Sequence, residues 1–236
     1  MNFLVQQIFT GKPKTVGDKK AVSPMEREWK SGIFKEAVSG EIWVGRTNLE
    51  GDGQADLKNH GGPEKAVFAY PVEHYSFFHQ EYGLTAMQAG GMGENLSLLN
   101  MLERDVCIGD TYEIGGALIQ VSQPRQPCWK PARRFKRKDL SLLIQNSGRT
   151  GWYFRVLQEG FIHSGQTLTL VNRPAPEWTI ANCNHVMHVN KEDIEQAVAL
   201  AACEWLPINW KNTLNKRVQL GNSGNPAKRL YGPNEE

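Results

Sequence analysis

The sequence of 236 residues lacks several features that would assign a protein to a class at once. It has only 4 cysteines, and no two of them form a C-x-x-C pair. This spacing argues against a zinc ribbon and against an iron–sulfur cluster bound by such pairs. Without an export signal, the four thiols are expected to stay reduced: Cys107, Cys128, Cys183 and Cys203.

Long apolar runs are also missing. No stretch reaches the roughly 18 apolar residues of a membrane-spanning helix. The first residues lack the basic start of a signal peptide, and Gln6 and Gln7 interrupt their apolar run. We therefore expect a cytoplasmic protein with no membrane partner. The formal net charge of +2 is too small to indicate a nucleic-acid partner by itself.

Short segments with alternating apolar residues dominate the first three quarters of the chain. They predict strands over 2–9, 41–47, 94–99, 105–114, 117–122 and 166–173, and Gly115-Gly116 predicts a hairpin. One helix is predicted over 72–82, where apolar residues recur at helical spacing before Gly83. Strands this closely spaced favour a mainly β fold, with a barrel domain over 1–173.

The composition changes at Pro174. From there to residue 220, apolar residues at helical spacing predict three short helices, too small a unit to be stable alone. We expect this C-terminal three-helix subdomain, 174–220, to pack on the barrel. Residues 221–236 are predicted to form a flexible tail.

Cys128 stands out among the cysteines because of its neighbours in SQPRQPCWK. Pro124, Pro127 and Pro131 argue against a regular strand or helix, so the sequence predicts a constrained loop. No acidic residue occurs between 122 and 138, and basic side chains lower the pKa of a thiol and favour the thiolate, a soft-metal ligand. An unreactive loop cysteine is the alternative, and the residues alone favour neither. The nearest bases are Arg125, Lys130, Arg133 and Arg134.

A second cluster lies in DLKNHGGPEKAVFAY, which spans 56–70. His60 precedes a tight glycine turn and could transfer protons or contact a phosphate, and Lys65 could bind an anion. Asn95, in GGMGENL, lies where backbone amides could also meet an anion. Lys35, in SGIFKEAV, is a further candidate. For each of these residues an ordinary exposed side chain is the alternative.

Aromatic and basic residues alternate over 129–138, a pattern that could bind single-stranded nucleic acid. A charged rim without a ligand would give the same pattern. We favour a third interpretation, in which these bases surround a small anionic cofactor beside the Cys128 thiolate, with no nucleic-acid partner.

Taken together, these motifs resemble the MOSC family (molybdenum cofactor sulfurase C-terminal domain), in particular its YiiM-type members, known as 6-hydroxylaminopurine resistance or reductase proteins. The matching segments run in order from about 30 to 172, and NHGGPEKAV with QPRQPCWK is the specific combination. The resemblance implies a β-barrel of mixed strands. It also implies a molybdenum cofactor with Cys128 as the metal ligand and Lys35, His60 and Arg125 as basic pocket residues. Lys65, Glu94 and Asn95 lie in matching motifs.

The same resemblance implies an oxidoreductase that detoxifies N-hydroxylated bases or amines such as 6-hydroxylaminopurine. His60 is then the expected proton donor, and Cys128 and His60 are the expected catalytic residues. Electrons would come from a separate protein, for which a flavin reductase is expected, because the sequence shows no nucleotide-binding fold. Pyridoxal phosphate binding is a further property that the resemblance associates with the family. The alternative function is a carrier of the molybdenum cofactor, or a sulfur-relay module, without turnover.

Overall fold

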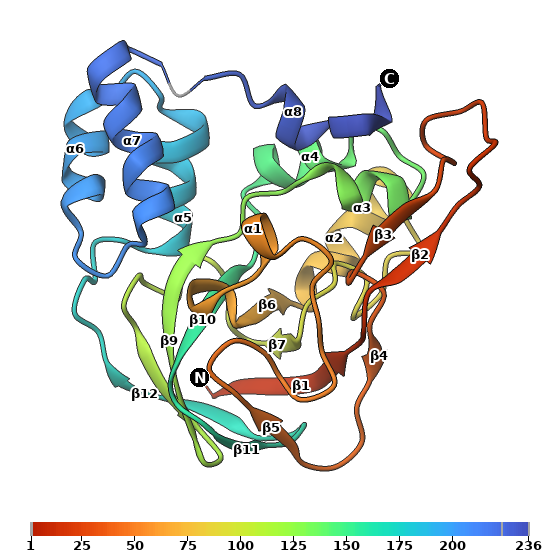
Figure 1. The fold of residues 1–236 in the computed structure, drawn as a ribbon. Coiled ribbons are helices and arrows are strands. Elements are labelled where there is room, and N and C mark those ends of the chain that lie inside the picture. Colours follow the sequence, from red (N-terminus) through yellow and green to blue (C-terminus); the bar gives the residue numbers. More distant parts are fainter. Residues whose placement is uncertain (1, 223, 236) are drawn as a thin grey trace.

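The centre of the computed structural model, which describes residues 2–222 and 224–235, is a closed barrel (Figure 1). Seven strands follow one another in the order β12-β8-β9-β10-β6-β7-β1, and pairing of β1 with β12 closes the ring. Only β6 and β7 are parallel, so the barrel is mixed. This confirms the predicted fold class. The strands are β1 (Phe3–Thr10), β6 (Val67–Pro71), β7 (Leu96–Leu99), β8 (Thr111–Ile114), β9 (Ala117–Pro124), β10 (Trp152–Gln158) and β12 (Thr167–Asn172).

The smaller strands lie outside this ring. Strand β4 (Glu36–Ala37) pairs with the end of β1. Strands β2 (Lys14–Val16) and β3 (Trp29–Ser31) form an arm at the side of the molecule, and β5 (Ile42–Val44) pairs with β11 (Gly160–Ile162) (Figure 1).

The hairpin predicted at Gly115-Gly116 joins β8 and β9. The strand predicted over 105–114 begins only at Thr111. The preceding residues form a turn instead, in which the backbone N–H of Cys107 donates to the Asp110 carboxylate at 2.8 Å. An aspartate that binds the backbone in this way competes with strand pairing.

Helices cover the barrel on its outside. Helix α2 (Glu73–Tyr82) ends at Gly83, whose φ of 66° is left-handed, as the predicted helix end requires. With α4 (Leu140–Ser147), it encloses a second apolar cluster beside the barrel core. Two shorter elements, α1 (Leu57–His60) and the 3-10 turn Pro63–Lys65, lead into β6. None of the helices in the described part of the chain is both long and apolar enough to cross a membrane.

The predicted C-terminal helices are present. They are α5 (Ile180–Asn184), which continues as a π-helical turn over His185–Val189, α6 (Ile194–Ala202) and α7 (Ile208–Leu220). Their apolar residues, including Leu200, Trp210 and Leu214, belong to the same buried cluster as the barrel interior. The helices are therefore packed on the barrel through a shared core.

The segment after α7 differs from the predicted flexible tail. It forms α8 (Ala227–Leu230) and the 3-10 turn Gly232–Asn234, and it passes over α4 and α3 (Trp129–Arg134) (Figure 1). Arg133 donates to the Asn234 side-chain oxygen at 2.7 Å, and Leu230 is buried. These contacts hold the described part of the tail in place. Ser223 and Glu236 lie outside the described residues, and the domain boundaries stay predictions.

Candidate functional site

One pocket brings together all six residues that the sequence singled out as binding residues. They come from four separate segments of the chain, and the folding of the barrel is what places them side by side. The pocket, called the inner pocket below, is lined by Lys35, His60, Lys65, Asn95, Arg125 and Cys128, together with Phe68, Lys130 and Tyr153.

Cys128 lies on the segment that leaves β9, immediately before α3. The predicted loop is thus shorter than expected, because a regular helix begins at Trp129 in spite of Pro131. A proline in the first turn of a helix is tolerated, since the N–H that it lacks has no partner there. The Ser141 hydroxyl of α4 donates to the Cys128 carbonyl at 2.6 Å, which ties the cysteine backbone to that helix.

The surroundings of Cys128 favour its thiolate. Burial by itself raises the pKa of this thiol, but a hydrogen bond and the charge of His60, the charge of Arg125 and the backbone N–H of Lys130 oppose it. The net effect lowers the pKa to about 6. At neutral pH the sulfur is therefore anionic, which is the form that binds soft metals. Of the two interpretations left open by the sequence, the geometry supports the poised thiolate.

Arg125 provides a buried positive group in the inner pocket. It is 5% exposed, and its guanidinium carbon lies 5.1 Å from the centre of the Phe68 ring. Its Nη1 atom is buried and has no hydrogen-bond partner among the described residues. An unsatisfied buried donor of this kind costs free energy unless a ligand meets it. Arg125 is thus suited to an anion that enters the inner pocket.

Lys35 and Asp52 form a buried ion pair in the wall of the inner pocket, with side chains 5% and 0% exposed. Burial lowers the pKa of Lys35, although the Asp52 carboxylate acts in the opposite direction. Asp52 also accepts from the Asn95 amide at 3.0 Å and from the Gly11 backbone at 3.0 Å. The sequence analysis missed Asp52; the one available signal was its place within the stretch from about 30 to 172 that resembles the family.

The Asn95 amide is fully engaged with the protein. Its oxygen accepts from the Phe68 backbone N–H at 3.0 Å, while its nitrogen donates to Asp52 and to the Phe9 carbonyl. The neighbouring Glu94 is completely buried and binds the Gly90 backbone at 2.7 Å instead of facing the pocket. Both residues therefore shape the wall of the inner pocket.

Lys65 and Tyr153 also line the inner pocket. Burial lowers the pKa of Lys65, whose ammonium donates to the Asn59 carbonyl at 2.6 Å. Burial also raises the pKa of Tyr153 to about 12, which keeps its hydroxyl protonated and able to donate. Tyr153 was missed by the sequence analysis, although it lies within the same stretch that resembles the family.

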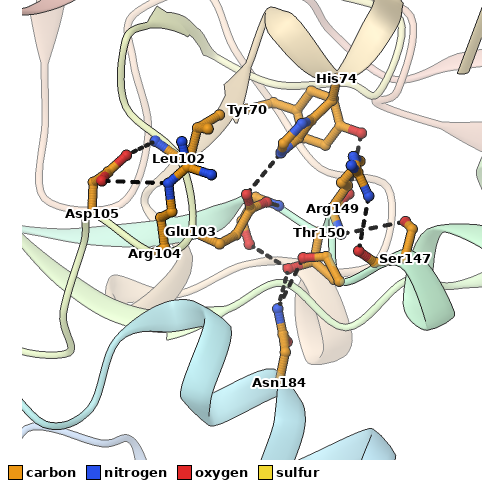
Figure 2. Close-up of polar contacts among 12 residues, drawn as sticks. Tyr70, His74, Leu102, Glu103, Arg104, Asp105, Ser147, Arg149, Thr150 and Asn184 are labelled. Carbon is orange, nitrogen blue, oxygen red and sulfur yellow. Dashed lines mark hydrogen bonds and ion pairs between the residues drawn. The ribbon is translucent and has the colours of Figure 1, made fainter. Parts of the chain in front are cut away.

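Figure 2 shows a buried polar network around Glu103, His74, Thr150 and Asn184. The Glu103 carboxylate binds His74 at 2.7 Å and the Gly151 backbone N–H at 2.8 Å. The Gly151 carbonyl in turn accepts from the backbone N–H of Arg125 at 3.0 Å. Asn184 joins the same network from the helical region, because its amide donates to the Thr150 hydroxyl at 2.8 Å. The network thus fixes the backbone where the chain turns toward Cys128.

Comparisons with known protein families agree with this arrangement. The family model described as "MOSC domain" matches residues 56–169, which contain His60, Arg125 and Cys128. A second family model, described as "YiiM-like, 3-alpha helix domain", matches residues 178–221, which contain α5, α6 and α7.

Individual proteins are similar over most of the chain. Protein YiiM of Escherichia coli is 37% identical over 204 residues, which cover 86% of this chain and 91% of that protein. The crystal structure of YiiM from Geobacillus stearothermophilus has a TM-score of 0.75 at 37% identity and covers 92% of this chain and 99% of that one. A protein of Gibberella moniliformis named "Reductase" is 36% identical over 181 residues, 75% of this chain but only 32% of that protein.

Proposed function

This chain belongs to the YiiM-like group of the MOSC-domain family, and we propose that it is a molybdenum-dependent reductase of N-hydroxylated compounds. The single observation that carries the proposal is the position of Cys128 in one pocket with His60 and Arg125, whose hydrogen bond and charges lower the pKa of the thiol to about 6. The similarity to a protein named a reductase supports oxidoreductase activity.

The residues of the inner pocket fit the molybdenum cofactor. Cys128 would bind the metal, because a thiolate is a suitable soft ligand. The unpartnered Nη1 of Arg125 would meet an anionic group of the cofactor, with Lys35 and Lys65 as further cations. When bound, the cofactor supplies the two electrons that cleave the N–O bond of the substrate.

The protein would supply the protons and exclude water. In the overall reaction R–NHOH, two electrons and two protons give R–NH2 and water. His60 lies against the Cys128 sulfur and is our candidate for the group that protonates the departing hydroxyl oxygen. The pocket walls formed by Phe68 and Met92 would keep bulk water away from the N–O bond.

Electrons would reach the site from a separate protein, for which we propose a flavin reductase. Basic residues that line the pocket, such as Lys65 and Lys130, would favour an acidic donor surface. The substrate would be a small N-hydroxylated base or amine, of which 6-hydroxylaminopurine is the compound to test first.

The test is turnover of 6-hydroxylaminopurine by cofactor-loaded protein with a chemical electron donor. We expect formation of the aminopurine, and we expect His60→Ala to lower kcat by about 10²-fold or more, as loss of a general acid does, while leaving the cofactor content unchanged. Loaded protein that reduces no N-hydroxylated compound would rule out the enzyme and leave a cofactor carrier or sulfur-relay module.

A further inference from the structure

A second cavity adjoins the inner pocket and extends toward the helical region. This outer cleft lies between α1, the end of β9, α7, and α8 with the segment before it, and it includes Gln123, Asn209 and Lys228. The two cavities share part of their lining, including His60, Cys128 and Tyr153. A molecule in the outer cleft would therefore reach the same sulfur and imidazole as one in the inner pocket.

The outer cleft contains its own unsatisfied donor. Gln123 is 1% exposed, and its side-chain oxygen accepts from Asn209 at 2.9 Å. Its Nε2 atom is buried and finds no partner among the described residues. A buried amide N–H costs free energy unless an acceptor meets it, so this atom indicates a ligand with an acceptor at that position.

The charge of the outer cleft indicates an anionic ligand. Six lysine and arginine side chains line it, and Asp56 is its one carboxylate. Asp56 is already bonded to the Asn59 backbone at 3.1 Å and to the Asn59 amide at 2.8 Å. The six cations are Lys30, Lys58, Lys65, Lys130, Lys228 and Arg229, and none of them forms an ion pair with an acid among the described residues.

Aromatic side chains also line the outer cleft. Trp129 and Tyr153 line the outer cleft together with Cys128 and the lysines. A flat heterocycle packs well on such rings, and its ring nitrogens are acceptors that can meet a buried amide N–H. A phosphate monoester suits several converging cations.

We propose that the outer cleft is the substrate site and that its substrate is a phosphorylated N-hydroxylated heterocycle, in the form of a nucleoside monophosphate. This inference rests on the proposed function and adds the substrate class to it. Gln123 would bind an acceptor of the base, and Lys58 and Lys228 would bind the phosphate. The hydroxylamino group would then face His60 and Cys128, where the two cavities meet.

Binding can be measured without catalysis. Calorimetry with adenosine 5′-monophosphate, an unreactive probe, should show binding to protein with and without its cofactor. We expect Lys58→Gln and Gln123→Met each to weaken binding at least tenfold. Lys216→Gln, an exposed lysine of α7 outside the cleft, should leave binding unchanged. Absence of binding, or equal binding by all variants, would overturn the proposal.

Two further results separate the possible sources of the phosphate and the two hypotheses. If loading with cofactor abolishes binding of the probe, the cleft serves the phosphate of the cofactor and the proposal fails. In turnover, the N-hydroxylated monophosphate should have a kcat/KM at least tenfold above that of the free base, and Lys58→Gln should remove this advantage. Equal values would also overturn it. Binding as expected without any reduction would refute the proposed function and leave the nucleotide site standing.

Discussion

Burial and charge act in opposite directions on the Cys128 thiol. The basic residues in SQPRQPCWK are visible in the sequence, but the strongest opposing contact comes from His60, which is 68 positions earlier in the chain. Only the fold brings α1 against the segment after β9. The sequence could therefore name the cysteine and the histidine as candidates, whereas their hydrogen bond depends on the barrel.

Thiol reactivity of protein without cofactor tests this contact. The rate of alkylation by iodoacetamide should fall as pH drops through about 6, because the thiolate is lost there. In His60→Ala this midpoint should move upward, since the hydrogen bond and charge that stabilise the thiolate are gone. Burial raises the pKa of Cys107 to about 11, so that thiol should not react in this range. A midpoint near 9 in the unaltered protein would contradict the assignment.

The buried ion pair between Lys35 and Asp52 leads to a second prediction about single residues. Asp52→Asn should lower the free energy of unfolding by about 3–5 kcal/mol, because it leaves the Lys35 ammonium buried without a counter-charge. Urea unfolding measures this difference. The matched control is Glu36→Gln, which breaks an exposed pair with Lys14 and should leave stability nearly unchanged. Equal effects of the two substitutions would show that Lys35 is not buried as described.

Regular hydrophobic patterns in the sequence predicted several helices and strands correctly. Elements whose position depends on contacts between distant segments were not predicted. Alternating apolar residues predicted β1 and β9, and helical spacing predicted α2. Gly115 and Gly116 predicted the hairpin between β8 and β9. The helix that starts at Trp129 was missed because Pro131 was interpreted as a helix breaker, although it occupies the first turn. Strand β10 was missed, and its place in the barrel depends on pairing with both β9 and β6.

The turn before β10 gives a prediction at the scale of elements. Gly151 has a φ of 67°, and a Cβ there would lie 2.3 Å from the Ala69 carbonyl oxygen. Gly148 has a similar φ of 69°, but a Cβ there would meet nothing within 4 Å. Gly148→Ala should cost about 1–2 kcal/mol for the left-handed backbone alone. Gly151→Ala should cost more, about 3 kcal/mol or above, because it also displaces β6. Equal losses on urea unfolding would contradict this packing.

At the scale of the whole molecule, the C-terminal region supports the site from two sides. Asn184 of α5 donates to Thr150 in the turn before β10 (Figure 2), and Gly151 of the same turn accepts from the Arg125 backbone N–H. Arg229 of α8 donates to the Pro127 carbonyl, next to Cys128, and to the Gln145 side chain at 2.7 Å. The polar composition of the tail predicted a flexible segment. Its hydrogen-bond partners lie about 100 residues away in the sequence, so the pattern of the tail alone could not indicate them.

The Arg229 contact predicts how the tail affects the site. Arg229→Gln should remove the hydrogen bond from the charged guanidinium to the Pro127 carbonyl and speed amide hydrogen exchange over 126–130, with the barrel strands unaffected. Exchange measured by mass spectrometry reports both regions at once. The neighbouring exposed residue provides the control, since Lys228→Gln should leave exchange at 126–130 unchanged. Unchanged exchange in Arg229→Gln would show that the tail does not restrain this segment.

The most direct test of the account is the molybdenum and pterin content of Cys128→Ala, produced in a host that makes the cofactor. We predict that the unaltered protein and Cys107→Ala carry close to one equivalent of the metal, and that Cys128→Ala stays folded and carries almost none. Full metal content in Cys128→Ala would contradict the assignment of Cys128 as the ligand.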